Sequence, residues 1–242
     1  MAESVAVEWP DNLTVQGRMT FPLYTEESLV QVAAWRERKK FAKPDYDEVT
    51  GFGLFLTQAQ QDKIKKHLLE VYIPFASTLK KESGGKYGLD PKIILKLQKL
   101  VEEDDFSENN LPLRDLSDSD ERNLEKNGFD NVVSKVRVLG PRDNGPVKIK
   151  ALVKRDGMSS VVPITDDDVV EKMGEANDHT KLWWGASWPF RTELRFNAYQ
   201  AQGFGISAYG TGVYLLADQE LKQFSNNNSD VAVAEDGDDW EE

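Results

Sequence analysis

The segment from Trp188 to Tyr199 alternates between apolar and polar side chains, and this period of two constrains the fold more than any other feature of the sequence. One parity carries the large apolar residues Trp188, Phe190, Leu194 and Phe196. The other parity carries Arg191, Glu193, Arg195 and Tyr199. A strand of this composition buries one face and leaves the other in water, so we expect it to belong to a sheet whose core lies on the Trp188 side.

Similar alternation elsewhere in the chain predicts about six strands, separated by turn residues. The expected strands are residues 13–22, 52–56, 132–139 and 147–154, with a short return strand at 160–164, and two long strands within 181–217 that join near Ala201 to Gly203. No internal repeat is present. This number and spacing of strands fits a small β-barrel that is closed or nearly closed.

A helical insertion is expected after the second strand, over about residues 57–130. Thr57 followed by Gln60 fits a capping box, and apolar residues then recur at helical spacing. Pro74 is expected to kink or end this first helix, because its ring and its missing N–H group disturb the preceding turn.

A second helix of the insertion is expected over about 91–103, where Asp90 provides the N-cap and Pro91 the first helical position. The residues that follow, 104–131, are acidic and rich in Asn and Ser, so we expect a loop there. Beyond the insertion, a short helix with an Asp-rich first turn is expected over 165–176.

The charge of the chain is distributed unevenly. The net charge is −12, which by itself argues against nucleic acid as a partner. Residues 230–242 hold −7 and residues 101–130 hold −8, which leaves the rest of the chain at +3. The terminal segment has almost nothing to bury, so we expect a solvated tail. Such a tail either serves solubility alone or competes with nucleic acid for a binding site on the mildly basic rest of the chain.

The composition disfavours several kinds of chemistry. The chain has no Cys, which removes disulfides, thiol catalysis and the Cys-based zinc sites. His67 and His179 are far apart in the sequence, which argues against a His-based metal centre or a Ser-His-Asp triad. We therefore expect no cofactor, no metal and no enzymatic activity. The sequence shows no signal peptide and no transmembrane stretch, so we expect a soluble, intracellular protein without membrane contact.

The polar face of the strand that ends at Tyr199 suits single-stranded DNA, because phosphates require cations and unstacked bases require flat aromatic surfaces. Lysines in 147–154 repeat the pattern on a second strand, and Arg137 repeats it on a third. Trp183 and Trp184 are adjacent, so in a strand they face opposite ways. One belongs to the core, and the other is an exposed stacking platform or packs beneath the insertion. An ordinary sheet surface with charges for solubility is the alternative.

Three other interpretations have some support in the sequence. Asp104, Asp105 and the run Asp166 to Asp168 are of the type that binds Mg²⁺, as in a Mg²⁺-dependent nuclease, although we expect solvated or helix-stabilising acids there. An acidic protein that mimics DNA would need carboxylates along an ordered face instead of in a tail and a loop. The segment Gly203 to Ala208 matches a dinucleotide-binding pattern, but a β-rich stretch follows it and not a helix.

Three segments carry a resemblance to a known family. KPDYDEVTGFG at 43–53 is similar to a Lys-Pro-Asp-Tyr…Gly-Phe-Gly segment of the short-tailed coliphage single-stranded DNA-binding protein. WPFRTELRFNAYQAQGFGISAYGTGVYLLADQELKQF at 188–224 joins a strand to a Gly-rich strand as in related phage proteins, and EDGDDWEE places an aromatic residue near the end of an acidic tail. The chain resembles the single-stranded DNA-binding proteins of tailed bacteriophages, Enterobacter phages among them. Its 57–130 insertion and the extra residues before Lys43 are departures from the coliphage protein.

This resemblance implies a mainly β protein built on an OB-fold barrel of five to six strands with a helical insertion. It also implies sequence-independent binding of single-stranded DNA in phage DNA replication, recombination and repair, in the cytoplasm of the infected bacterial host. Together with the strand patterns, it suggests that phosphates are contacted by Lys43, Arg137, Lys148, Lys150, Lys154, Arg191 and Arg195. The residues expected to stack on bases are Tyr46, Trp184 and Tyr199.

The expected organisation is one OB-type domain over 1–229, which includes the insertion, and a disordered acidic tail over 230–242. The resemblance implies that the tail binds phage or host replication proteins. The tail residues expected to do so are Asp236, Asp238, Asp239, Trp240, Glu241 and Glu242. The sequence leaves open whether the protein is a monomer or a dimer.

Overall fold

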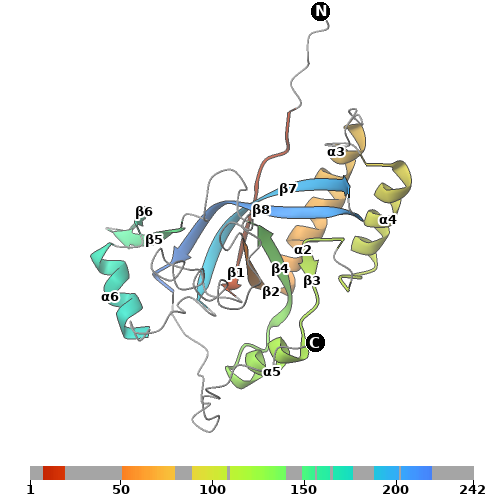
Figure 1. Ribbon diagram of the computed structural model, residues 1–242. Helices are drawn as coiled ribbons and strands as arrows, with labels where there is room; N and C mark the ends of the chain where they lie inside the picture. The colour runs from red at the N-terminus through yellow and green to blue at the C-terminus, as the bar shows by residue number, and fades with distance from the viewer. Residues whose placement is uncertain are drawn as a thin grey trace, which may run out of the picture.

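The computed structural model describes residues 8–19, 51–79, 89–107, 110–139, 149–155, 157–163, 166–176, 188–201 and 203–219. The strands in this part of the chain are β1 (Leu13–Met19), β2 (Gly51–Thr57), β3 (Leu113–Arg114), β4 (Val132–Leu139), β5 (Ile149–Arg155), β6 (Met158–Pro163), β7 (Pro189–Ala201) and β8 (Gly203–Leu216). The helices are α2 (Gln58–His67), the π-helix η1 (Leu68–Tyr72), α3 (Ile73–Thr78), α4 (Pro91–Glu102), α5 (Asp118–Lys126) and α6 (Asp167–Ala176) (Figure 1).

Five of these strands close into a barrel. Their order is β4-β2-β1-β7-β8, and β8 returns to β4. The neighbouring strands in this ring are antiparallel, except for β4 and β8, which pair in parallel through Val138 with Ala208 and Leu139 with Tyr209. A five-stranded ring of this order is the OB-fold, so the expected fold class is confirmed. Strand β3 extends the sheet beside β4, and β5 and β6 extend it beside β8.

The apolar side of β7 is buried, as the alternation in its sequence predicts. The side chains that share the apolar parity are each at most 3% exposed: Trp188, Phe190, Leu194 and Phe196. On the opposite side Arg195 and Tyr199 are exposed, and Arg191 is half-buried. The same rule holds on β5, where Ala151 and Val153 are buried and the lysines on either side of them, Lys150 and Lys154, are exposed. Strand period therefore decides which side chains fill the core and which remain outside.

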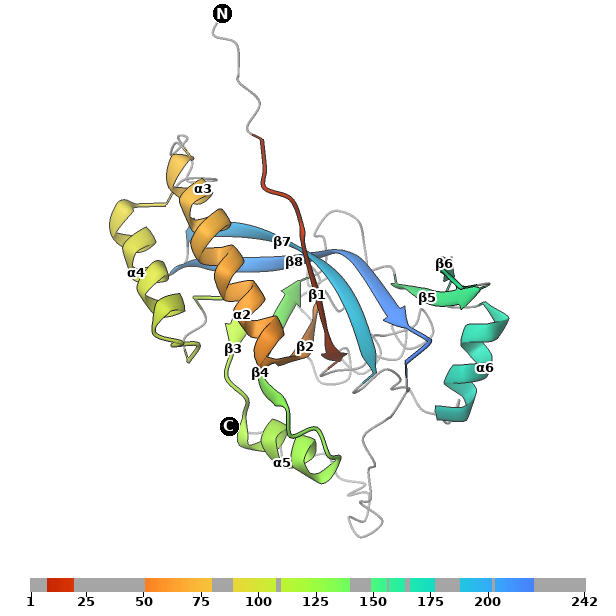
Figure 2. The same ribbon diagram turned by 180° about the vertical axis from the view of Figure 1, so that it is seen from behind.

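The helical insertion follows β2 and covers one side of the β7–β8 pair. From behind, α2 and α3 lie in front of these two strands, whereas from the front the strands lie before the helices (Figures 1 and 2). The ring centroid of Phe196 on β7 lies 5.3 Å from that of His67 and 5.7 Å from that of Tyr72. The insertion thus buries the apolar side of the two strands, and their other side keeps its exposed residues.

Two details of the first inserted helix differ from expectation. Thr57 is the N-cap residue, but its side chain makes no capping hydrogen bond. Gln60 instead accepts a hydrogen bond of 2.9 Å from the backbone N of Gln16, because β1 lies beside the start of α2. Pro74 does not end the helix. The helix continues from η1 into α3 without a break, and in the widened turn of η1 the backbone N of Ile73 donates to the carbonyl oxygen of Leu68. The missing N–H group of Pro74 is thus accommodated directly after this widened turn and not at a free helix start.

The expectation of a loop over 104–131 was wrong in part, because this stretch contains β3 and α5. Ser117 and Asp120 form a reciprocal capping box at the start of α5. The helix then packs on the barrel through a small core cluster of Phe55, Leu124 and Phe129. Leu124 is the one buried residue within α5, so the acid-rich segment shows little helical periodicity in its sequence.

The other two expected helices are present as α4 and α6. The Asp90 side chain caps α4 by accepting a hydrogen bond of 2.9 Å from the backbone N of Lys92. The expected boundary between domain and tail, at residue 229, lies outside the described residues. Within the described part of the chain, no helix has the length and apolar character needed to cross a bilayer.

Phe196→Ala is expected to destabilise the protein by about 3–5 kcal/mol, because Phe196 fills the space between β7 and the inserted helices. Urea unfolding followed by circular dichroism measures this cost. Glu125→Ala on the exposed side of α5 is the control and is expected to change stability by less than about 0.5 kcal/mol. Equal stability of the two variants would show that the insertion is not packed on β7.

Asp120→Asn is expected to weaken the attachment of α5 at neutral pH, by about 1 kcal/mol. Lys135 Nζ lies 2.5 Å from Asp120 Oδ2. Burial raises the pKa of Asp120, but hydrogen bonds from Lys135 and Ser117 outweigh it and lower the pKa below its usual value. A lowered pKa stabilises the fold above the unfolded-state value of about 3.9, and this stabilisation is lost as the pH falls through the folded-state value.

Urea unfolding at several pH values measures this effect. The difference between wild type and Asp120→Asn should shrink as the pH falls below about 4. A difference that stays constant across this range would contradict the role given to the Asp120 carboxylate.

Candidate nucleic-acid interface

Arginines and tyrosines gather on the outer side of β7 and β8. Arg191 pairs across the strands with Tyr214, and Arg195 pairs with Tyr209. Directly paired residues point to the same side of a sheet, so each pair sets a cation beside an aromatic ring. We call this surface the Arg–Tyr face and define it by Arg191, Arg195, Tyr199, Tyr209 and Tyr214. From Arg191 to Tyr199 the strand spans roughly 26 Å at about 3.3 Å per residue.

Glycines on β8 leave room for the tyrosine rings to lie along the sheet. A Cβ atom added to Gly205 would lie 2.5 Å from the hydroxyl oxygen of Tyr199. One added to Gly212 would lie 2.8 Å from Cε2 of Tyr214. Both side chains therefore cross the bare backbone of β8. Tyr199 remains 36% exposed, which leaves aromatic surface for a stacking partner.

Arg137 borders the Arg–Tyr face where β4 meets β8. The parallel pairing sets Leu139 beside Tyr209, and Arg137 lies two residues earlier on the same side of β4. Arg137 is exposed and makes no ion pair with another described residue. Lys135, two residues earlier again, is held by Asp120. Arg137 is thus the unneutralised cation of this strand among the residues that the structure describes.

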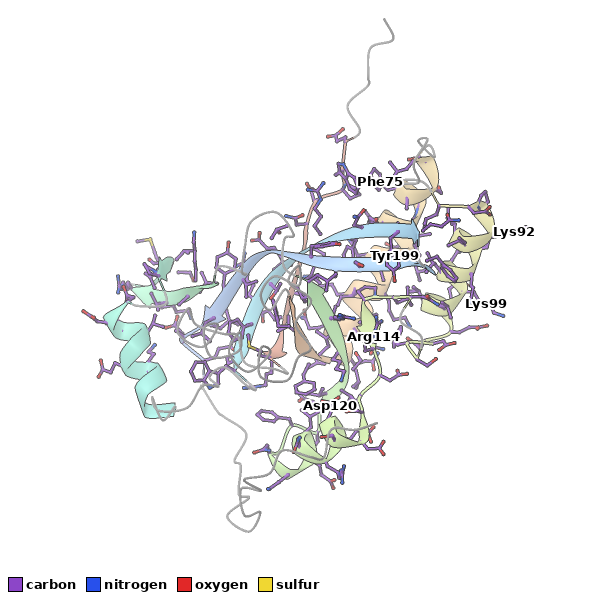
Figure 3. All side chains as sticks on the ribbon, in the orientation of Figure 1. Phe75, Lys92, Lys99, Arg114, Asp120 and Tyr199 are labelled. Atoms are coloured by element: carbon purple, nitrogen blue, oxygen red, sulfur yellow. The ribbon has the colours of Figure 1, made fainter. Side chains whose placement is uncertain are left out.

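Arg114 of β3 lies on the same border and within electrostatic reach of Tyr199; both residues are labelled in Figure 3. Its guanidinium donates to the carbonyl oxygens of Leu111 and Leu113. Burial, followed by the positive charge of Arg137, lowers the pKa of Arg114, while Tyr199 has the opposite effect. The two guanidinium groups therefore repel each other. An anion bound beside them would relieve this repulsion, as a phosphate of DNA would do.

Lys150 continues the cationic surface at the other end of the face. Strand β5 pairs in parallel with β8 and sets Lys150 beside Tyr214, opposite Arg191. The guanidinium carbon of Arg191 lies 5.8 Å from the ring centroid of Tyr214. Glu193, at 3.9 Å from Arg191, neutralises part of that charge. Lys154 is exposed farther along β5. Tyr214 is therefore flanked by cations on both neighbouring strands.

Trp9 adds an aromatic ring beside Arg195. The guanidinium carbon of Arg195 lies 4.7 Å from the ring centroid of Trp9, within cation–π range. The Trp9 ring in turn lies 5.1 Å from that of Phe75 on α3. Trp9 precedes β1, in a segment without strand or helix periodicity, so no sequence pattern indicates this contact.

The structure describes six of the ten residues expected to contact DNA. It brings Arg137, Lys150, Arg191, Arg195 and Tyr199 to the outer side of neighbouring strands, with Lys154 farther along β5. Lys43, Tyr46, Lys148 and Trp184 lie outside the described residues, as do the tail residues Asp236, Asp238, Asp239, Trp240, Glu241 and Glu242. Their roles, and the DNA contacts of the six, stay predictions.

Tyr209 and Tyr214 were not among the expected contact residues, because a bulge interrupts the alternation of β8. The register shifts between Glu193 and Leu194, which pair with Gly212 and Gly210, so Thr211 is the extra residue. The Thr211 hydroxyl donates to the carbonyl oxygen of Glu193 at 3.1 Å and holds the bulge. The bulge brings two tyrosines of opposite sequence parity to one side. The glycines around Thr211 were the available signal.

Three of the acids considered as Mg²⁺ ligands, Asp104, Asp166 and Asp168, form ion pairs with cations. Asp104 lies 2.5 Å from Lys65 Nζ. Asp166 and Asp168 lie 2.7 and 2.8 Å from the same nitrogen of Arg155. Within the described ranges, no three potential metal-ligating side chains come together. The positions of these acids correspond to the structural roles that the sequence suggests.

Comparisons with known proteins give structural neighbours only. No protein-family model and no curated protein matches the sequence. The chain is similar to the single-stranded DNA-binding protein from bacteriophage Enc34 with a C-terminal truncation, at TM-score 0.42 and 11% identity over 87% of each chain. For the same protein in complex with single-stranded DNA, the TM-score is 0.41 and the identity is 12%, over 91% of this chain and 99% of that chain. A further structure of that protein gives a TM-score of 0.40 and an identity of 11%, over 93% of this chain and 90% of that chain. The expected relation to an Enterobacter phage protein remains a prediction.

Arg137→Gln is expected to leave the fold intact and to raise its stability at low salt by up to about 0.5 kcal/mol, because it removes the repulsion of Arg114. Thermal unfolding at about 0.01 M and 1 M salt measures the gain, which screening should abolish at the higher concentration. Arg122→Gln on α5 is the control with the same change of charge. A destabilised Arg137→Gln protein would mean that Arg137 is a structural cation.

Proposed function

We propose that this chain is a non-enzymatic protein that binds single-stranded DNA without sequence preference along its Arg–Tyr face. The observation that carries the proposal is the cross-strand pairing of arginine on β7 with tyrosine on β8, which occurs at two levels along these strands. Phosphate binding requires cations, and base stacking requires aromatic rings. These pairs supply both at each level.

The geometry favours single strands over duplex. A single strand exposes its base faces, whereas a duplex hides them in its stack and offers base edges in its grooves. The tyrosines of the Arg–Tyr face belong to a sheet, and two of them lie against the backbone of β8 over glycines. Rings placed in this way meet base faces. Stacking contributes about 1–3 kcal/mol per base and tolerates any sequence.

The arginines of the border support phosphate contact beside the stacking sites. Arg114 and Arg137 repel each other, and Arg137 has no ion-pair partner among the described residues. Bringing a phosphate between two guanidinium groups offsets this repulsion by charge-assisted hydrogen bonds. Backbone phosphates carry no sequence information, so such contacts agree with binding that ignores sequence.

The biological role proposed with this activity is phage DNA replication, recombination and repair in the cytoplasm of an infected bacterium. It is supported by the resemblance of segments 43–53, 188–224 and 235–242 to phage proteins of that function. The acidic tail over 230–242 would bind phage or host replication proteins. The nuclease alternative finds less support, because Asp104, Asp166 and Asp168 are paired with cations.

The test is fluorescence anisotropy with labelled oligo-dT and with a duplex of equal length, over a series of salt concentrations. We expect tighter binding to oligo-dT and a steep loss of affinity with salt, because released counterions oppose binding. Equal affinity for the duplex, or a flat salt response, would contradict the proposal. A denaturing gel after incubation with Mg²⁺ should show intact oligo-dT, and cleavage would favour the nuclease alternative.

Single variants separate the two kinds of contact. Arg195→Ala should weaken binding and make the salt slope shallower by about 0.7, the value for one phosphate of a single strand. Tyr199→Ala should cost about 1–3 kcal/mol of binding free energy and leave the salt slope unchanged. Arg122→Ala on α5 is the control and should bind as the wild type does. If all three variants changed the salt slope by the same amount, the assignment of Arg195 to phosphate contact and of Tyr199 to base stacking would be wrong.

A further inference from the structure

We propose that the inserted helix α4 extends the DNA path beyond the Arg–Tyr face and holds phosphates with a stripe of lysines, Lys92, Lys96 and Lys99. This inference rests on the proposed function and gives the helical insertion a part in it. Residues four and three positions apart lie on one side of a helix, so the three ammonium groups line a single side of α4.

The lysine stripe lies on the solvent side of α4. The buried residues of the helix are Leu97, Leu100 and Val101, and all three lysines are exposed. Leu95 lies on the same side as the lysines and is 66% exposed. A stripe that joins cations with an exposed apolar side chain matches the two parts of a single strand, its phosphates and its bases.

The stripe costs the helix some stability. Like charges three or four residues apart on a helix repel each other. Lys99 lies 3.6 Å from Glu103, but the two side chains are 69% and 58% exposed, so this pair contributes little. Lys92 makes no ion pair with a described residue, although residues 101–130 hold a charge of −8. A bound polyanion would turn this repulsion into attraction.

Two contacts connect α4 to the end of the Arg–Tyr face. The backbone N of Asp90, the N-cap residue, donates a hydrogen bond of 3.0 Å to Oε1 of Gln200, the neighbour of Tyr199 on β7. Lys96 Nζ lies 4.9 Å from the ring centroid of Phe204 at the start of β8. In Figure 3, Lys92 and Lys99 lie on α4 beyond the end of the strands that carry Tyr199. A DNA strand that passes Tyr199 in this direction therefore meets the lysine stripe.

The extension predicts that α4 acts only on longer DNA. One OB-fold covers about 4–16 nucleotides, so a short oligomer is accommodated by the Arg–Tyr face alone. A longer one reaches the lysine stripe and gains phosphate contacts there. The lysines add affinity and salt dependence without base preference, since they contact the backbone of the DNA.

The test compares wild type with the double variant Lys92→Gln, Lys99→Gln. Glutamine keeps the helix propensity and removes the charge. Anisotropy titrations use oligo-dT of about 6 and about 20 nucleotides, lengths within and beyond the reach of one OB-fold. We expect unchanged binding of the short oligomer. With the long one we expect weaker binding and a salt slope shallower by about 1.4, for two lost phosphate contacts. Circular dichroism confirms that the variant is folded.

The matched control is Lys126→Gln together with Arg122→Gln on α5, which removes two charges from a helix at another place on the molecule (Figure 1). This control should bind both oligomers as the wild type does. If the α4 variant bound the long oligomer with the affinity and the salt slope of the wild type, the inference would be overturned and the proposed function would stand. An equal loss with both lengths would also overturn it. Failure of the wild type to bind either oligomer would overturn the proposed function and this inference together.

Discussion

The pairing of β4 with β8 is the contact on which the rest of the structure depends, because it closes the barrel. It consists of two neighbouring positions, Val138 with Ala208 and Leu139 with Tyr209. Both Val138 and Ala208 are fully buried. Gly210 admits the close approach of β4, since an added Cβ atom would lie 3.1 Å from Val138 Cγ1. Closure gives each barrel strand an inside and an outside, and it fixes Arg137 beside the Arg–Tyr face.

The length of the β7–β8 pair explains why the barrel carries an insertion. Strand β7 pairs with β1 only as far as Leu194, and the strand continues to Ala201. The apolar side chains of this extension, Phe196 among them, would be in water without the helices of the insertion. Burying one Phe side chain stabilises a fold by about 1.5–3 kcal/mol. The helices cover one side of the extension, and the opposite side is the Arg–Tyr face.

The sequence predicted those parts of the fold in which one period continues without interruption. The facing of β7 followed from its alternation, and Asp90 before Pro91 located the start of α4. Two features escaped because they break or lack a period: the bulge at Thr211, which brings both tyrosines of β8 to one side, and α5, which buries a single residue of its own. The β4–β8 pairing joins residues about 70 positions apart, and no local pattern reports such a contact.

The distribution of ion pairs reconciles an acidic protein with a candidate DNA-binding face. Away from the face, several described cations are held by carboxylates: Lys65 by Asp104, Lys135 by Asp120, Arg155 by Asp166 and Asp168, and Lys172 by Asp218. On the face, Arg195 lies over the Trp9 ring, and Arg137 repels Arg114. Screening limits exposed charges to about 10 Å at 0.1 M salt, so a DNA strand responds to local charge and not to the net charge of −12. The acids elsewhere then repel DNA from other surfaces, and the paired cations offer it little. On the proposed function, the acidity of the chain would therefore strengthen the preference of DNA for one face.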